Sequence, residues 1–140
     1  MTSDIDLDLM FTIKYLENTD QRTIYLLISE DNALPPDLTK NCAGFKVDGW
    51  RVYAVSGDGS ATQETDTGID LLAYSQFTRL RIYVKISKYV VFWVNGKFVG
   101  LHETNVPSKT AYYIILAIES KDGNARRFDA GEILIKYVEA

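Results

Sequence analysis

The chain has 140 residues, of which 46% are hydrophobic and 24% charged, a composition typical of one globular domain spanning residues 1–140. Its net charge of −4 and the lack of a Lys/Arg cluster beyond Arg126-Arg127 argue against nucleic acid as a partner. No apolar window approaches the roughly 20 residues of a membrane-spanning helix, so no membrane span is predicted.

The first half of the chain is predicted to form strands joined by turns. It begins with acidic residues where a signal peptide has a basic end and an apolar run, although this assigns no compartment. Alternation of apolar and polar residues predicts strands at residues 6–16, 22–29, 43–47 and 50–56. Asp48-Gly49 predicts a hairpin turn between the last two. The polar run 56–68 predicts a surface loop rather than a domain linker.

The second half continues in the same way. Strands are predicted at residues 79–86, 88–94, 97–103, 111–119 and 131–139. Asn95-Gly96 is a strong hairpin signal, because both turn residues must adopt positive φ, and it places Val94 opposite Lys97 and Phe92 close to Val99. About nine strands with turns between them predict an all-β fold, an antiparallel sandwich or barrel.

The stretch FTRLRIYVKISKYVVFWVNGKFVGLHETNVP resembles the late core of concanavalin A-like lectin/glucanase (laminin G-like) jelly rolls. Upstream, AGFKVDG and DTGIDL are similar to mid-domain strands of that group, and YYIILAIES and GEILIKYVE look like its last strands. The resemblance covers residues 6–139 and implies an antiparallel β-sandwich of two stacked sheets. This fold carries glycan binding, glucan hydrolysis, protein binding and structural roles, so it does not choose among them.

The glucanase branch of this superfamily implies a Glu-x-Asp-x-x-Glu set on one strand, because retaining hydrolysis needs two carboxyl groups about 5–5.5 Å apart. The similar segment ETDTGID contains Glu64, Asp66 and Asp70, with no Glu at the acid/base position. Its flanking residues are polar and resemble a loop more than a buried strand. We therefore predict no catalytic residues and no enzyme activity, with the three acids solvated.

Two single residues, Cys42 and His102, carry nucleophile or proton-transfer chemistry. Only one cysteine is present, so no intrachain disulfide forms, and we expect Cys42 to be a small buried hydrophobe, with a reactive thiol or an intermolecular bridge as alternatives. His102 is predicted to be an ordinary histidine at the surface or rim. A Ser/His/Asp or Cys42/His102 arrangement stays open at this stage.

Metal binding is weakly indicated. Asp58, Asp66 and Asp70 with nearby carbonyl groups supply several of the six to eight oxygens that Ca²⁺ requires. Their spacing matches no known calcium loop, and such acids commonly form turns. The prediction is therefore no metal site and no cofactor, with Ca²⁺ as the alternative.

Sugar binding requires an aromatic platform and planar polar groups. The predicted ligand-binding residues are Trp93, Tyr83, Arg81 and Trp50, the first three outward-facing on neighbouring strands. The alternative is that these side chains pack across strands for stability or form a protein interface.

Assembly is the other interpretation. Residues 112–119 and 133–139 are apolar on both faces, so the opposite sheet or another subunit must cover them, and an edge is open to strand addition. The sequence therefore predicts a non-catalytic carbohydrate-binding module that uses the concave sheet face. A structural protein forming homo-oligomers is the alternative, and a β-glucan hydrolase ranks last.

Overall fold

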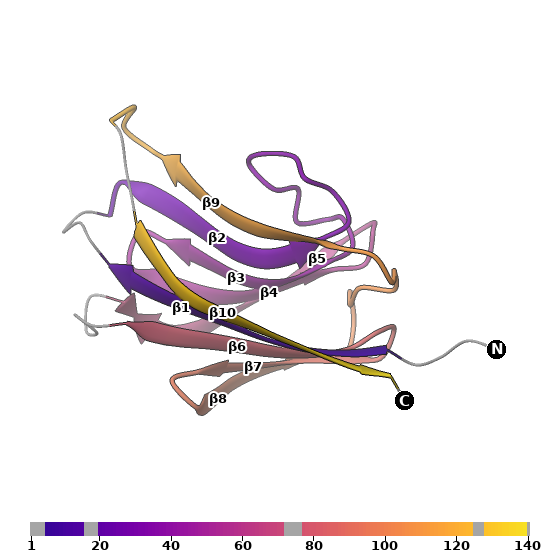
Figure 1. The fold of residues 1–140 in the computed structure, drawn as a ribbon. Coiled ribbons are helices and arrows are strands. Elements are labelled where there is room, and N and C mark those ends of the chain that lie inside the picture. Colours follow the sequence, from indigo (N-terminus) through magenta and orange to yellow (C-terminus); the bar gives the residue numbers. More distant parts are fainter. Residues whose placement is uncertain (1–4, 16–19, 72–76, 125–127, 140) are drawn as a thin grey trace.

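The structure, a computed structural model, describes residues 5–15, 20–71, 77–124 and 128–139. Ten strands occupy most of these residues (Figure 1). They are β1 (Ile5–Tyr15), β2 (Arg22–Ser29), β3 (Cys42–Asp48), β4 (Arg51–Gly57), β5 (Thr62–Asp70), β6 (Thr78–Lys85), β7 (Tyr89–Val94), β8 (Lys97–His102), β9 (Tyr113–Ser120) and β10 (Phe128–Glu139). No helix in this part of the chain is long and apolar enough to cross a membrane.

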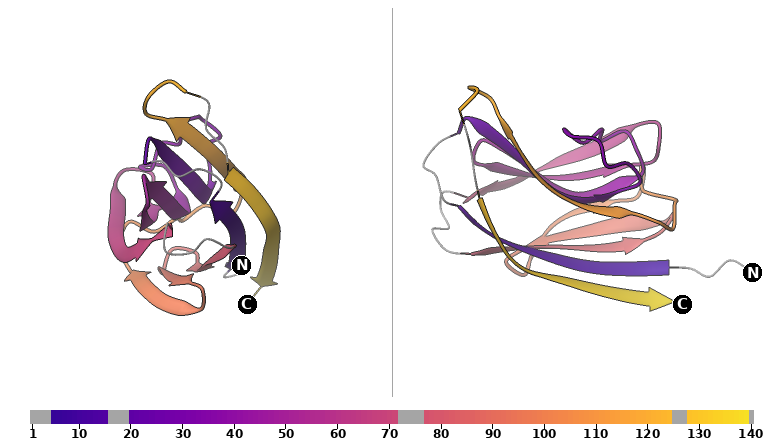
Figure 2. Two further views of the ribbon diagram at one scale, coloured as in Figure 1. Left: turned by 90° about the vertical axis from the view of Figure 1, so that its left-hand side faces the viewer. Right: turned by 45° about the horizontal axis from the view of Figure 1, so that its top comes forward.

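The strands form two antiparallel sheets that stack face to face. The first, here called the β1 sheet, has the order β10-β1-β6-β7-β8, and the second, the β2 sheet, has the order β5-β4-β3-β2-β9. Figure 2 shows the two layers from two further sides, with β9 and β10 on the same side of the sandwich. The prediction of an all-β, two-layer antiparallel sandwich is confirmed.

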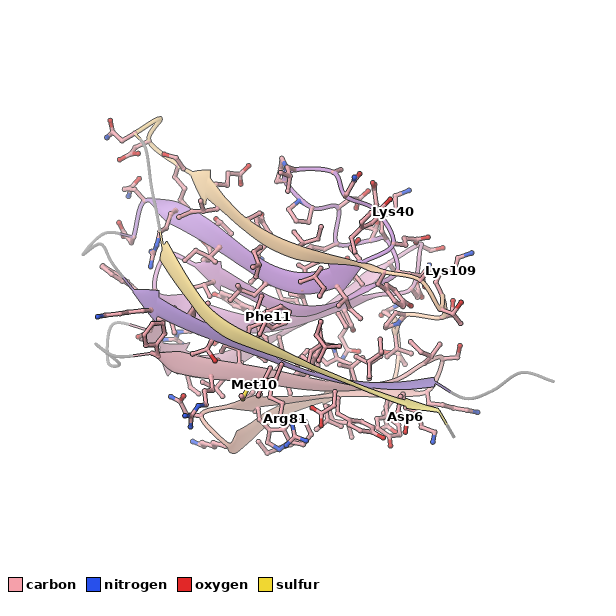
Figure 3. All side chains as sticks on the ribbon, viewed as in Figure 1. Asp6, Met10, Phe11, Lys40, Arg81 and Lys109 are labelled. Atoms are coloured by element: carbon pink, nitrogen blue, oxygen red, sulfur yellow. The ribbon has the colours of Figure 1, made fainter. Side chains whose placement is uncertain are left out.

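Strict alternation along the strands produces the core between the sheets. In β6, Leu80, Ile82 and Val84 are fully buried, whereas the alternate residues Arg79 and Arg81 are exposed. Figure 3 places Phe11 between the layers and Arg81 on the outer side of the β1 sheet. The rings of Phe45 and Phe92, one from each sheet, meet edge to face with centroids 5.6 Å apart. The prediction that every second residue points inward is therefore confirmed for β6 and β7.

A second, smaller apolar cluster lies on the outer face of the β2 sheet, at the end where β3 begins. It contains Tyr25, Leu27, Cys42, Val55 and Ile115, with Leu38 packed against it. The segment 30–41 folds over this cluster, and it can approach closely because position 57 is a glycine. A Cβ atom there would lie 2.3 Å from the carbonyl oxygens of both Leu38 and Lys40. This end of the outer face is thus covered.

One predicted loop is wrong in part. Residues 62–68 of the run expected to be a surface loop belong to the edge strand β5 (Thr62–Asp70), and residues 56–57 end β4. Few of its side chains are apolar, so hydrophobic alternation does not reveal it. Hydrogen bonds stabilise it instead: Thr67 Oγ1, for example, donates to the Val52 carbonyl at 2.7 Å.

The pairing of β7 with β8 shifts by one residue from the register that an unbroken hairpin around Asn95-Gly96 would have. Val94 pairs with Lys97 as predicted, but Phe92 pairs with Gly100 because the register shifts between Phe92 and Trp93. A one-residue shift moves every later side chain to the opposite face. His102 therefore pairs with Val90 and points into the core, while Leu101 points outward.

Candidate functional site

The uncovered end of the β2 sheet carries an open polar hollow of about 510 Å³. Figure 1 shows β2 and β9 bowed towards the other sheet, so this outer face is concave. The hollow combines two aromatic rings with acidic and basic side chains. It is lined by Asp20, Asp48, Gly49, Trp50, Arg51, Tyr53, Asp66, Asp70 and Lys121.

Trp50 is held in place by the β3–β4 turn. Gly49 adopts φ of +61°, the left-handed conformation that this turn requires and that glycine tolerates. Beneath the turn lies Arg22, which is 1% exposed; its Nη1 donates to the Gly49 carbonyl at 2.7 Å, and its guanidinium lies 5.8 Å from the Trp50 ring centroid. The Trp50 carbonyl in turn accepts a hydrogen bond from the Leu71 amide at 2.8 Å. Trp50 therefore lines the hollow from a backbone that these hydrogen bonds hold in place.

Arg51 crosses from β4 to β5 and orients two carboxylates. Its Nε donates to Asp70 Oδ1 at 2.8 Å, and its Nη1 donates to Asp66 Oδ1 at 3.0 Å. The Gly68 amide also donates to Asp66, and these interactions lower the pKa of the Asp66 carboxyl, with the backbone hydrogen bond contributing most. At neutral pH, Asp66 is therefore a fixed hydrogen-bond acceptor.

Tyr53 forms the second aromatic surface, beside another ion pair. Lys46 lies with its Nζ 5.2 Å from the Tyr53 ring centroid and 2.6 Å from Glu64 Oε1. Lys121, just after β9, pairs with Asp48 at the other side of the hollow. Aromatic rings beside preoriented carboxylates and a guanidinium suit a ligand with C–H faces and several hydroxyl groups.

The structure does not bring the four predicted ligand residues together. Trp50 lines the hollow on the β2 sheet, whereas Arg81, Tyr83 and Trp93 lie on the outer face of the β1 sheet. There the Arg81 guanidinium lies 4.7 Å from the Trp93 ring centroid and donates two hydrogen bonds to Asp8, at 2.8 and 2.7 Å. Arg81 is therefore already paired with a carboxylate and with an aromatic ring on this face.

Tyr83 is engaged in the same way. Its ring stacks on Tyr89 with centroids 6.4 Å apart, and its hydroxyl donates to Asp6, which raises the pKa of the Tyr83 phenol to about 12. The alternative interpretation of this face, cross-strand packing, matches these contacts.

The sequence analysis did not identify Arg51 as a residue of the site. It also did not predict that Asp66 and Asp70 share a hydrogen-bond partner. Assigning residues 56–68 to a loop concealed that β5 pairs with β4, which sets Arg51 opposite Asp70. Three threonines, Thr62, Thr65 and Thr67, were the available signal, since threonine favours strands.

His102 is not the surface histidine that the sequence predicted, because the bulge in β8 turns it inward and it is fully buried. Its Nδ1 lies 2.7 Å from Ser56 Oγ and its Nε2 lies 2.8 Å from Thr65 Oγ1. Burial lowers the pKa of the imidazole to about 4. This Ser56–His102 pair is closed to a substrate, since both residues are 0% exposed, and it joins the two sheets instead.

Cys42 lies in the outer cluster of the β2 sheet, on the opposite face from His102, so the two do not form a pair. Burial raises the pKa of its thiol to about 12. We expect the folded protein to react with a thiol reagent such as DTNB at least a hundredfold more slowly at pH 8 than the urea-unfolded chain. Equal rates, followed by absorbance, would show that Cys42 is accessible.

Among the described residues, no group of three or more His, Cys, Asp or Glu side chains has the geometry of a metal site. The three acids considered for Ca²⁺ bind different partners. Asp58 accepts hydrogen bonds from the Ser60 and Ala61 amides of its own turn, whereas Asp66 and Asp70 bind Arg51.

No protein-family model matches the sequence, and no curated protein is similar to it at a significant level. Solved structures do match. A β-1,3-1,4-glucanase (lichenase) derived from a mouse hindgut metagenome superposes with a TM-score of 0.56 and 14% identity, over 99% of this chain and 66% of that one. The binding domain of botulinum neurotoxin serotype D/C VPI 5993 gives a TM-score of 0.53 and 12% identity, over 96% of this chain and 32% of that one.

These identities are low, so the likeness concerns the fold. The chain has the concanavalin A-like β-sandwich fold that the sequence resemblance implied. It spans about two-thirds of the lichenase chain and about a third of the toxin domain chain.

Proposed function

We propose that this protein binds carbohydrate, without hydrolysing it, in the hollow on the concave outer face of the β2 sheet. The observation that carries the proposal is the arrangement of Trp50 and Tyr53 beside the Arg51–Asp66–Asp70 cluster. An aromatic ring covers the C–H face of a pyranose, while carboxylates and a guanidinium bind its hydroxyl groups. Because the polar groups are already oriented by one another, less conformational entropy is lost on binding.

The carboxylates of β5 support binding more than hydrolysis. A glycosidase needs one carboxylic acid whose pKa is raised, so that it protonates the leaving group. Asp66 has a lowered pKa, and Glu64 is paired with Lys46 at 2.6 Å. Each acid therefore has a cationic partner and suits the role of hydrogen-bond acceptor.

The fold comparisons are consistent with this proposal. One similar structure is named as a β-glucanase and the other as a toxin binding domain, and both belong to proteins of about 12–14% identity. Soluble mixed-linkage β-glucan is accordingly the first probe, together with a broad glycan array.

The test is Trp50→Ala. We expect its affinity for the best glycan on the array to fall at least tenfold, because tenfold corresponds to about 1.4 kcal/mol and a lost stacking platform costs about that much. Isothermal titration calorimetry measures the change. Trp93→Ala is the matched control, since it removes the same side chain from the other sheet, and we expect it to bind normally.

Two results would contradict the proposal. Equal losses in both variants, with folded circular dichroism spectra, would remove the hollow as the site. Release of reducing sugar from β-glucan, abolished by Glu64→Gln, would show that the protein is a hydrolase.

A further inference from the structure

The two sides of the sandwich are closed differently. On one side, the edge strands β5 and β8 are joined by side chains: Thr65 bonds to His102, and Thr104 Oγ1 donates to Gln63 at 3.0 Å. On the other side, β9 and β10 end their sheets and do not pair with each other (Figure 2). This second side is the open side of the core.

Apolar side chains that face inward are exposed at the open side. In β9, Ile114 and Leu116 point towards the β1 sheet, as their pairing with Ile28 and Leu26 requires, yet they are 42% and 38% exposed. In β10, Ile135 pairs with the inward-facing Leu9 and is 55% exposed. An inward-facing isoleucine or leucine is normally buried, so these exposed side chains are typical of a surface that a partner covers.

The edge of β9 also lacks the usual protection against strand addition. Edge strands are commonly short, charged or irregular. β8 has only six residues and begins with Lys97, and β5 carries three acids and a register shift opposite Arg51 and Tyr53. In contrast, β9 reads YIILAIES, eight residues with a single charge at Glu119. In the described part of the chain its hydrogen-bonded neighbour is β2 alone.

We propose that β9 pairs antiparallel with β9 of a second copy of this chain, which extends the β2 sheet across a two-fold axis. With Leu116 opposite its own equivalent, Ile114 lies opposite Ile118 and Tyr113 lies opposite Glu119. This register keeps the inward residues of both copies on one face, because paired positions have the same parity. The added strand covers Ile114 and Leu116 and shields the open side of the core.

The β9 edge is complementary to itself, which makes a second copy the occupant. The chain carries a net charge of −4, but little of that charge lies on this edge. The β9 edge presents one acid per copy, and the antiparallel register sets that acid opposite the Tyr113 hydroxyl rather than opposite the other Glu119. Tyr113 is 54% exposed and available for this contact. On the outer side, Leu34 and Pro35 line an apolar hollow beside residues 116–119, which gives an added strand a second apolar surface.

Sedimentation equilibrium and light scattering of the full chain test the proposal. We expect a species of twice the 15.8 kDa chain mass at high concentration. Leu116→Lys places a charge on the inward edge position, and we expect it to weaken dimerisation at least a hundredfold. Leu101→Lys is the matched control, because Leu101 is a comparably exposed leucine on the outer face of the β1 sheet, and we expect it to remain dimeric.

Circular dichroism establishes that the variants are folded. If Leu116→Lys fails to fold, hydrogen exchange of the wild-type protein decides, since pairing at β9 slows amide exchange in residues 113–120 as concentration rises. A monomeric wild-type protein, a dimer that survives Leu116→Lys, or concentration-independent exchange at β9 would each overturn the proposal. A dimer lost in Leu101→Lys instead would assign the interface to the β1 sheet. Glycan binding is not used in this test, so the two proposals fail separately.

Discussion

Acidification from pH 7 to pH 4 is expected to lower the free energy of unfolding by about 3 kcal/mol through His102 alone. Its pKa in the folded protein is about 4, against 6.5 for an exposed histidine. The unfolded chain therefore binds a proton between these two values while the folded protein does not, so stability is full above pH 6.5 and falls as the pH drops towards 4. A difference of 2.5 pKa units corresponds to about 3 kcal/mol. Urea unfolding at a series of pH values measures it.

The physical cause is the position of His102 between the sheets. The imidazole is fully buried, its two nitrogens bond to the hydroxyl groups of Ser56 and Thr65, and Phe92 lies 4.7 Å away between ring centroids. None of these neighbours carries a negative charge that would stabilise an imidazolium. Protonation therefore places an uncompensated charge in the core.

His102→Gln is the control, because glutamine keeps an amide donor and acceptor but does not titrate. We expect this variant to lose about 1–3 kcal/mol at pH 7, from imperfect replacement of two buried hydrogen bonds. Its stability between pH 6.5 and 4 should then fall by about 3 kcal/mol less than that of the wild-type protein. An identical pH dependence in the two proteins would assign the acid sensitivity to carboxylates elsewhere.

The burial of His102 was not predictable from the sequence, although the hairpin that carries it was. The alternation of β7 and the Asn95-Gly96 turn were sufficient to predict the hairpin and the Val94–Lys97 pair. They were not sufficient to predict the bulge at the start of β8, because an extra residue in one strand leaves no mark on the hydrophobic pattern of the other. The polarity of His102 then favoured the surface, although two hydroxyl partners from distant strands satisfy it inside.

The β5 strand was missed for a related reason. Alternation predicts a strand whose inner side chains are apolar, whereas β5 directs Thr65 to His102 and Thr67 to a main-chain carbonyl. Its outer acids are neutralised by Lys46 and Arg51, which are remote in sequence. A polar edge strand of this kind becomes visible only when its partners are placed in space.

The candidate site was predictable only in its components. Trp50 and the nearby acids were recognised separately, but the hollow arises where the β3–β4 turn, β5 and the segment after β9 meet. The Arg81/Tyr83/Trp93 set was correctly expected to lie on one sheet face. The sequence did not show that the other sheet is concave, since curvature depends on the twist of all the strands together.

The second large effect is expected from Phe92→Ala, with a loss of about 3–5 kcal/mol in the free energy of unfolding. Phe92 is fully buried, packs edge to face on Phe45 of the opposite sheet, and contacts the ring of His102. Removing the ring leaves a cavity that the rigid sheets cannot close. Since domains of this size are stabilised by about 5–15 kcal/mol, the variant should be close to unfolding at 37 °C, which thermal and urea denaturation measure.

Phe98→Ala is the matched control, since Phe98 is 58% exposed on the outer face of the same hairpin. Only the part of its ring that is buried against Trp93 contributes, so we expect a loss of no more than about 1 kcal/mol. Phe98 pairs with Trp93 between the Asn95-Gly96 turn and the register shift, so both rings lie on the outer face. If the two variants lost equal stability, the assignment of Phe92 to the core and of Phe98 to the outer face would be wrong.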